Sequence, residues 1–141
     1  MTIRIFLCLL LSLSTAVFAA NKDDTAKILV VKKLYSSHNE PALSKEFTRL
    51  LKMNEARWES GNFCLSEDFM LTGFAPDTDE NLARRTLKLS MANGKVKASS
   101  KASDAAYFSV IQENGHWVID DMIQYGESKK TFLKKCLGRK K

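Results

Sequence analysis

The sequence predicts an α+β fold in which N-terminal helices pack on a curved, four-stranded antiparallel meander and a short helix closes the chain. Residues 41–61 carry apolar side chains at helical spacing. Two Asn-Gly pairs, at 93–94 and 114–115, each separate two apolar runs, which is the strongest short-range signal for a hairpin. Another helical pattern follows at residues 128–137. Helices and strands that are segregated along the chain indicate an α+β protein.

The N-terminus, residues 1–20, has the features of a secretory signal peptide. Arg4 supplies a positive charge, and residues 5–13 form an apolar stretch that is too short to cross a membrane. Small residues follow, and we expect cleavage after Ala19 or Ala20. This leader predicts a periplasmic protein, with an extracellular location as the alternative.

The mature chain, residues 21–141, has the length of a single domain and no transmembrane segment. The full chain has 22 Lys and Arg against 16 Asp and Glu, a net charge of +6, and loss of Arg4 with the leader lowers this to +5. Cys64 and Cys136 remain after cleavage, and an even pair in an oxidising compartment predicts a disulfide. It would stabilise the fold by about 4 kcal/mol. Two buried thiols are the alternative.

Two helices are expected first. Asp24-Thr25 would cap a helix with one apolar side, although the β-branched pair Val30-Val31 leaves a strand as the alternative. Its apolar side is Ile28, Val31, Leu34 and Tyr35. The second helix would start with Pro41 at its first position and end at Ser60-Gly61. Its inward stripe is Leu43, Phe47, Leu50, Leu51, Asn54 and Trp58, which we interpret as core rather than as a ligand-lining surface.

Residues 62–81 form an acidic connector without Lys or Arg. Residues 77–81 within it space side-chain oxygens as the beginning of a calcium loop does. Leu82, however, stands where such a loop has its glycine, and Lys88 stands where it has its final glutamate. We therefore expect a solvated loop or a partner-binding surface, and no calcium site.

Two hairpins follow. In the first, strands that start at Arg85 and end at Ser100 place Met91 opposite Val96 and Leu89 opposite Ala98, with Lys88, Lys95 and Lys97 outside. In the second, the predicted pairs are Gln112 with Trp117, Ile111 with Val118, Val110 with Ile119, Ser109 with Asp120, Phe108 with Asp121, and Tyr107 with Met122. Trp117 is expected in the core, and a hydrogen bond is expected between Ser109 and Asp120. Apolar side chains on both faces predict that this hairpin lies in the middle of the sheet.

The last strand should end at Gly126, and the final helix should begin at Glu127 or Ser128. Its inward residues are predicted to be Phe132, Leu133, Cys136 and Leu137. Its outward residues are predicted to be Lys129, Lys130, Lys134 and Lys135, followed by the tail of Arg139, Lys140 and Lys141.

The run NGHWVIDDM at residues 114–122 resembles the closing strands of the nuclear-transport-factor-like (cystatin-like cone) superfamily, where a turn followed by Trp-x-Ile-Asp-Asp is common. Asp68–Gly73 lies about where members place an Asp-led segment between helices and sheet. The chain looks closest to a family of small exported bacterial proteins of unassigned function. The resemblance implies the cone fold, but it selects no function, because the superfamily includes enzymes, ligand carriers and interaction domains.

The residues that could support catalysis are poorly placed for it. His38 falls in a polar loop and His116 at a hairpin corner. Neither has a nucleophile or an acid at a spacing that is typical of a catalytic site. Asp120 and Asp121 are neighbours on a strand, so we expect them on opposite faces, where they cannot share a proton. The sequence predicts a protein that is not an enzyme and has no cofactor or metal.

We expect instead a small exported binding protein whose partner is another protein, of the inhibitor or immunity type that would counter a toxin-like effector. Opposite charges on such surfaces mainly raise association rates and selectivity. The candidate contact residues are the acidic Asp77, Asp79 and Glu80 and the basic Lys134, Lys135 and Arg139. Weak contact with the anionic envelope is an alternative role for the basic tail, whereas the expected location argues against nucleic acid.

A small-ligand carrier that uses the apolar interior of the cone is the alternative function. The residues that would line such a pocket, or fill it as core, are Phe69, Phe74, Phe108 and Trp117.

Overall fold

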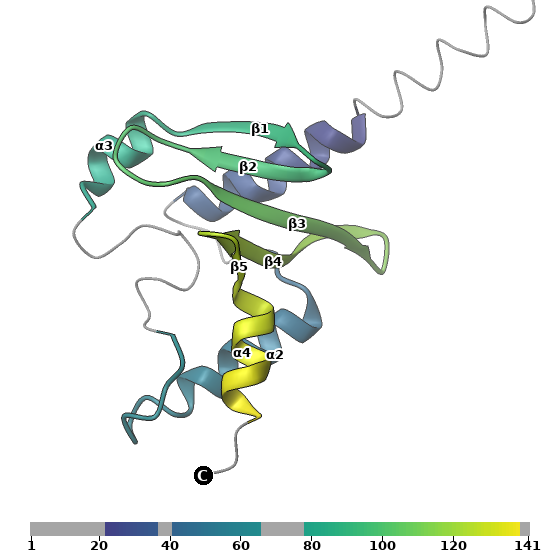
Figure 1. Ribbon diagram of the computed structural model, residues 1–141. Helices are drawn as coiled ribbons and strands as arrows, with labels where there is room; N and C mark the ends of the chain where they lie inside the picture. Colours follow the sequence, from purple (N-terminus) through teal and green to yellow (C-terminus); the bar gives the residue numbers. More distant parts are fainter. Residues whose placement is uncertain (1–21, 37–40, 66–77, 139–141) are drawn as a thin grey trace, which may run out of the picture.

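The computed structural model describes residues 22–36, 41–65 and 78–138 and has the α+β architecture that the sequence predicts (Figure 1). A helix at residues 22–35 precedes α2 (Lys45–Glu55) and α3 (Glu80–Arg85). The strands are β1 (Lys88–Ala92), β2 (Lys95–Ser99), β3 (Ala106–Glu113), β4 (His116–Gln124) and β5 (Glu127–Ser128), and α4 (Lys129–Leu137) follows them. The predicted leader, His38, Phe69, Phe74, Asp77 and Arg139 lie outside the described residues.

The strands form one antiparallel meander in the order β1-β2-β3-β4-β5. The four long strands are those predicted, and β3 lies in the middle of the sheet. The fifth strand has two residues and was not predicted, because the Tyr125-Gly126 turn lacks the Asn that marks the other two turns. Asn93, Asn114 and Tyr125 have φ of 50°, 51° and 53°, and each is followed by a glycine with positive φ. All three turns thus have the backbone of a type I′ hairpin.

Both predicted hairpin registers are correct next to the turns, where Met91 pairs with Val96 and Val110 pairs with Ile119. A β-bulge then shifts the register between Ser109 and Val110. The pairs beyond it are Ser109 with Asp121, Phe108 with Met122 and Tyr107 with Ile123, so the three predicted pairs there are wrong. The bulge lets Met122 follow Ile119 into the core, where strict alternation would have placed Asp121.

The core lies between the sheet and the helices. The helix at residues 22–35, purple in Figure 1, runs behind the β1–β3 part of the sheet. Its Val31 and Tyr35 are buried, and the ring of Tyr35 packs edge-on against that of Phe108 with centroids 6.1 Å apart. The predicted helix is therefore correct and the strand alternative is wrong. Residue 22 is already helical, so Asp24-Thr25 lies within the helix and does not cap it.

Helix α2 begins later than predicted because the segment before it joins the edge of the sheet. The Ser44 N–H donates to the Ile119 carbonyl and the Ile119 N–H donates to the Ala42 carbonyl, both at 2.8 Å. Ser44 caps the helix, because its Oγ accepts from the Phe47 N–H. The predicted helix start at Pro41 is therefore wrong. The regular helix ends at Glu55, ahead of the predicted Ser60-Gly61 end. The predicted inward stripe is correct for Phe47, Leu50, Leu51 and Asn54, which are buried.

Helix α3 was not predicted, and it shortens the first strand. Asp79 caps it by accepting from the Leu82 N–H at 3.0 Å, and the helix includes Arg85, where the strand was expected to start. The strand β1 starts at Lys88 instead. Within the described ranges, none of the helices has the length and apolar content that a membrane span requires.

The predicted disulfide joins Cys64 to Cys136 across 72 residues of sequence. Buried Asn54 positions Cys64: its Oδ1 accepts from the Cys64 and Leu65 N–H groups at 2.6 and 3.1 Å, and its Nδ2 donates to the Leu65 carbonyl at 2.8 Å. These contacts fix the chain that leaves α2 against α4. Helices α2 and α4 lie side by side beyond β4 and β5 in Figure 1. The disulfide links their C-terminal ends.

Candidate functional site

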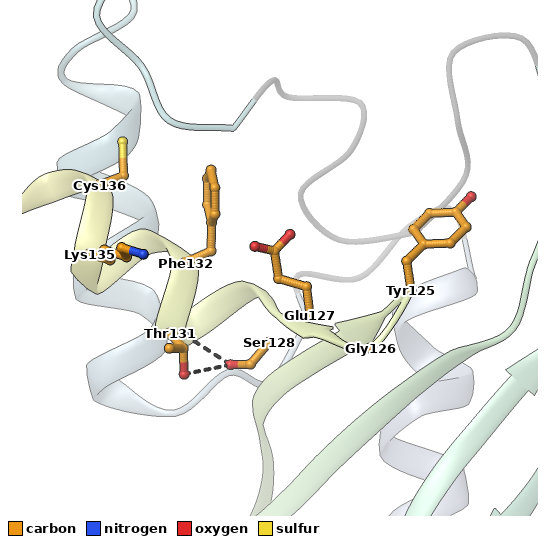
Figure 2. Close-up of a pocket in the computed structure, with 8 residues that line it drawn as sticks. All are labelled: Tyr125, Gly126, Glu127, Ser128, Thr131, Phe132, Lys135 and Cys136. Atoms are coloured by element: carbon orange, nitrogen blue, oxygen red, sulfur yellow. Dashed lines mark hydrogen bonds between the residues drawn. The ribbon is translucent and has the colours of Figure 1, made fainter.

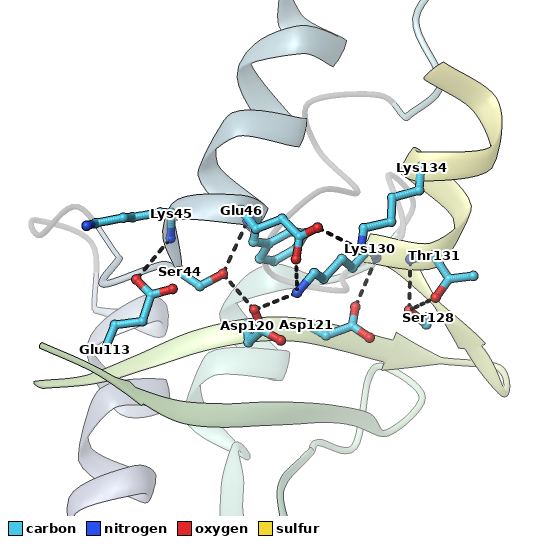
Figure 3. Close-up of polar contacts among 11 residues, drawn as sticks. Ser44, Lys45, Glu46, Glu113, Asp120, Asp121, Ser128, Lys130, Thr131 and Lys134 are labelled. Atoms are coloured by element: carbon cyan, nitrogen blue, oxygen red, sulfur yellow. Dashed lines mark hydrogen bonds and ion pairs between the residues drawn. The ribbon is translucent and has the colours of Figure 1, made fainter. Parts of the chain in front are cut away.

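A cluster of charged and polar side chains joins α2, β4 and α4, and we call it the Lys130 cluster (Figure 3). It consists of Ser44, Glu46, Asp120, Asp121, Lys130 and Lys134. Lys130 Nζ lies 2.7 Å from both Asp120 Oδ1 and Glu46 Oε2, and Lys134 Nζ lies 2.7 Å from Glu46 Oε1. The Ser44 hydroxyl donates to Asp120 Oδ1 at 2.7 Å.

The bulge in β4 brings Asp120 and Asp121 to the same neighbour. Asp120 binds the Lys130 ammonium, and Asp121 Oδ1 accepts from the Lys130 backbone N–H at 2.9 Å, at the start of α4. Both carboxylates point toward the helices in Figure 3. The predicted placement on opposite faces is therefore wrong. The predicted Ser109–Asp120 hydrogen bond is wrong as well, because Ser44 and Lys130 are the partners of that carboxylate.

The contacts within the cluster favour the charged forms of Glu46 and Lys130. Hydrogen bonds from Lys130 and Lys134 lower the pKa of Glu46 from 4.5 to about 2. Partial burial lowers the pKa of Lys130, but hydrogen bonds to Asp120 and Glu46 outweigh it, so that pKa is raised overall. The pairing of ammonium and carboxylate groups gives this cluster a role in docking α2 and α4 on β4.

The lysines of α4 differ from the prediction that all four point outward. Lys129 is 4% exposed, and burial lowers its pKa, while the charge of Glu127 opposes this effect. Lys130 lies inside the cluster, and Lys134 pairs with Glu46. Helical spacing could not show this, because α4 packs on both α2 and the sheet. Lys135 is exposed and, within the described part of the chain, has no ion pair.

The other predicted site residues are dispersed. Asp79 caps α3, and Glu80 forms an ion pair with Arg84 at 3.5 Å, so the two described members of the acidic segment have local structural partners. Phe108 is buried in the core. Trp117 packs against the core but is only partly buried, and the Lys27 ammonium lies 5.0 Å from its ring centroid. His116 is exposed at the turn, as expected.

Five cations gather on the first hairpin and its flanks, and we call them the basic face. They are Arg85, Lys88, Lys95, Lys97 and Lys101. The register places Lys88 opposite Ser99, Lys97 opposite Ser90 and Lys95 opposite Ala92. These lysines share the side of the sheet opposite to the buried Val96 and Ala98.

The basic face contains a groove and an aromatic ring. The groove has a volume of about 440 Å³ and is lined by Arg85, Thr86, Leu87, Lys88, Ser99, Ser100 and Lys101. Lys97 pairs with Tyr107 across β2 and β3, and its ammonium lies 5.8 Å from the ring centroid. The sequence contains a signal for this surface, namely that no Asp or Glu occurs between residues 81 and 103. The alternation of the first hairpin predicts outward lysines, but alternation alone does not distinguish a binding site from a solvated face.

A second concavity, of about 590 Å³, lies between the Tyr125-Gly126 turn and α4 (Figure 2). We call it the Tyr125 cavity. It is lined by Tyr125, Gly126, Glu127, Ser128, Thr131, Phe132, Lys135 and Cys136. Neither Phe108 nor Trp117 lines it or the groove of the basic face. The apolar side chains predicted to form a pocket are thus packing residues where the structure describes them.

Comparison of the chain with protein-family models, curated proteins and solved structures found no match in any of the three. The resemblance to the nuclear-transport-factor-like superfamily rests on its sequence motif and stays a prediction. In residues 22–36, 41–65 and 78–138, the side chains of His, Cys, Asp and Glu form no group of three or more that could hold a metal ion.

Proposed function

We propose that this protein is an exported, non-catalytic binding protein that holds an acidic partner protein through its basic face, as an inhibitor or immunity protein would. The observation that carries the proposal is the segregation of charge on the β1–β2 hairpin. Three of the five cations, Lys88, Lys95 and Lys97, lie on its strands, and Arg85 and Lys101 flank it. All five fall within residues 81–103, a stretch of 23 residues that contains no carboxylate. Such a surface attracts acidic partners and repels basic ones.

The charge on the basic face is available to a partner. The cations of the Lys130 cluster are neutralised by Glu46 and Asp120, and Arg84 is paired with Glu80. By contrast, none of the five basic-face cations forms an ion pair with another described residue. Arg85 is held by a hydrogen bond from its Nε to the Asn81 carbonyl at 3.3 Å, which leaves its positive charge uncompensated.

The shape of the basic face favours a protein partner. Its three lysines Lys88, Lys95 and Lys97 lie on hydrogen-bonded strands. Tyr107 beside Lys97 supplies the kind of aromatic side chain that anchors protein interfaces. The exported location that the leader predicts makes nucleic acid an unsuitable partner. Anionic lipid remains a competitor that the experiment must separate from protein.

We propose binding rather than catalysis because the two neighbouring aspartates have structural partners. Asp120 and Asp121, the pair that the sequence offers for acid–base chemistry, hold α4 and Lys130 in place. His116 is exposed at a turn and lines neither concavity described above. Phe108, which a carrier would use to line an internal pocket, fills the core instead.

The test compares two double variants that change the net charge equally. Lys88→Glu/Lys97→Glu reverses the basic face, and Lys32→Glu/Lys33→Glu reverses two exposed lysines on the helix at residues 22–35. Each tagged mature protein would be used to capture partners from a periplasmic extract of the cells that make it. A protein retained by wild type would be identified, purified and titrated against all three forms.

We expect an acidic protein that binds wild type and the Lys32/Lys33 control with equal affinity, and the Lys88/Lys97 variant at least tenfold more weakly. Equal binding by both variants would show that the basic face is not the contact surface. Vesicles of phosphatidylglycerol provide the lipid comparison. If they bind with the same dependence on Lys88 and Lys97 and no protein does, the partner is the membrane surface and the proposal is wrong.

A further inference from the structure

We propose that the Tyr125 cavity is a second binding site, separate from the basic face, for a small organic anion with a flat apolar body such as an aromatic sulfonate or carboxylate. Its volume of about 590 Å³ lies within the range of small-molecule sites. Its described lining includes two aromatic side chains, Tyr125 and Phe132, and one cation, Lys135.

The choice of Tyr125 at the turn is costly for the fold. The chain uses Asn at the same position of its other two tight turns, with φ of 50° and 51°, and Tyr125 adopts φ of 53°. A left-handed conformation is unfavourable for a bulky residue and easily adopted by Asn or Gly. The Tyr125 hydroxyl donates to Asp104 Oδ2 at 2.9 Å, but exposed hydrogen bonds contribute little net stability. Strain of this kind tends to be retained where a side chain has a function.

The Tyr125 ring is presented to solvent rather than to the core. The residue is 68% exposed, the most exposed large apolar or aromatic residue among those described. Its ring and that of Phe132 rise on either side of Glu127 in Figure 2, and all three line the same cavity. Phe132 is backed by the core, which holds its ring in place. Two such rings suit a flat apolar ligand, because aromatic groups favour stacked or edge-on contacts.

The charges around the cavity favour an anion. Lys135 is exposed at the wall and has no ion pair within the described ranges. Glu127 is the one carboxylate among the described residues that line the cavity, and it is attracted to Lys129 at the start of α4. The negative charge of Glu127 is therefore partly balanced from within the protein, whereas the positive charge of Lys135 is not. The Ser128 hydroxyl donates to Thr131 Oγ1 at 2.9 Å, and Ser128 Oγ caps α4 by accepting from the Thr131 N–H at 3.0 Å.

The experiment uses two fluorescent probes with the same ring system. 1-Anilinonaphthalene-8-sulfonate carries the anionic group, and N-phenyl-1-naphthylamine lacks it. Both would be titrated into the folded mature protein with its disulfide intact. The variants are Tyr125→Asn, which the other turns show to suit this backbone, Lys135→Gln, Glu127→Gln, and the matched control Lys88→Gln on the basic face.

We expect one sulfonate probe per protein. Lys135→Gln should weaken its binding about fivefold and Glu127→Gln should tighten it two- to fivefold, in line with the energies of exposed charge pairs, while the uncharged probe changes with neither. Tyr125→Asn should weaken both probes without lowering the melting temperature. Lys88→Gln should leave both unchanged.

Three results would overturn the proposal. One is the absence of saturable sulfonate binding to wild type. Another is binding that is unchanged in both Tyr125→Asn and Lys135→Gln. The last is a loss of melting temperature in Tyr125→Asn with probe affinity intact, which would show that Tyr125 serves only to tie its turn to Asp104.

Discussion

A single side chain, Lys130, connects three elements of the fold. Its ammonium meets Glu46 of α2 and Asp120 of β4 while its backbone belongs to α4, and the side chain is only 15% exposed. Lys134 sits one turn further along α4, meets only Glu46, and is 49% exposed. The two lysines therefore form a natural comparison between a partly buried ion pair and a surface ion pair.

Lys130→Met should lower the free energy of unfolding by about 1–3 kcal/mol, because it leaves two carboxylates without their shared cation in a partly buried place. Lys134→Met is the matched control, and its effect should stay within about 0.5 kcal/mol, as for other surface pairs. Urea denaturation of both variants measures the difference. Equal losses would mean that the Lys130 cluster does not hold α2 and α4 on the sheet.

Glu46 makes the free energy of unfolding depend on pH in the acidic range. Its pKa falls from 4.5 to about 2 in the folded protein because Lys130 and Lys134 donate to it. A carboxyl group whose folded pKa is depressed stabilises the fold above its unfolded pKa, and this contribution disappears as the pH falls through the folded pKa. The stability difference between wild type and Glu46→Gln should thus be full above about pH 4.5 and shrink to nothing near pH 2.

Melting temperatures measured between pH 7 and pH 2 provide the check on Glu46. The side chain is 41% exposed, so added salt should reduce the difference at neutral pH. A difference that stays constant across this pH range would show that Glu46 contributes through packing and not through its charge.

The disulfide is the main constraint at the level of elements, because it ties the chain after α2 to the last turn of α4. Removal of both thiols in Cys64→Ala/Cys136→Ala should lower stability by about 4 kcal/mol on the loop-entropy model. Alkylation of unreduced protein from the periplasm, followed by intact-mass measurement, should show no free thiol. Two alkylated cysteines in native protein, or a double variant as stable as wild type, would contradict the bridge.

Sequence patterns predicted the elements whose signals are local. The Asn-Gly turns fixed the pairs next to them, such as Met91 with Val96, since turn type and register are coupled. The even number of cysteines likewise predicted the disulfide, and helical spacing predicted the buried side of α2. The Tyr125-Gly126 turn was not, because it has the backbone of an Asn-Gly turn without its sequence.

The candidate sites depended on features that a sequence does not display. The bulge beside Val110 moves Asp120 and Asp121 to the same partner, and nothing in the alternation of β4 marks it. The burial of Lys129 and Lys130 follows from the packing of α4 on two neighbours. The acidic Asp79 was predicted as a contact surface but caps α3, a helix of 6 residues that is too short to show a periodic pattern.

At the scale of the whole molecule, the export of the protein is the premise of the proposed function. Protein recovered from the periplasmic fraction should begin at Ala20 or Asn21, as expected for cleavage after Ala19 or Ala20. Intact-mass measurement distinguishes these two ends from each other and from uncleaved protein. A chain that keeps Met1 and fractionates with the cytoplasm would remove the premise.

The central claim is that the basic face steers an acidic partner protein, and its most direct test is the association rate as a function of salt. The captured partner would be mixed with wild type, with Lys88→Glu/Lys97→Glu and with the Lys32→Glu/Lys33→Glu control. Exposed charges act over a Debye length of about 10 Å at 0.1 M salt and about 3 Å at 1 M. We predict that wild type associates at least tenfold faster than the Lys88/Lys97 variant at low salt, that the control stays close to wild type, and that the rates converge at 1 M salt. Rates that fall equally in both variants, or that do not respond to salt, would contradict the claim.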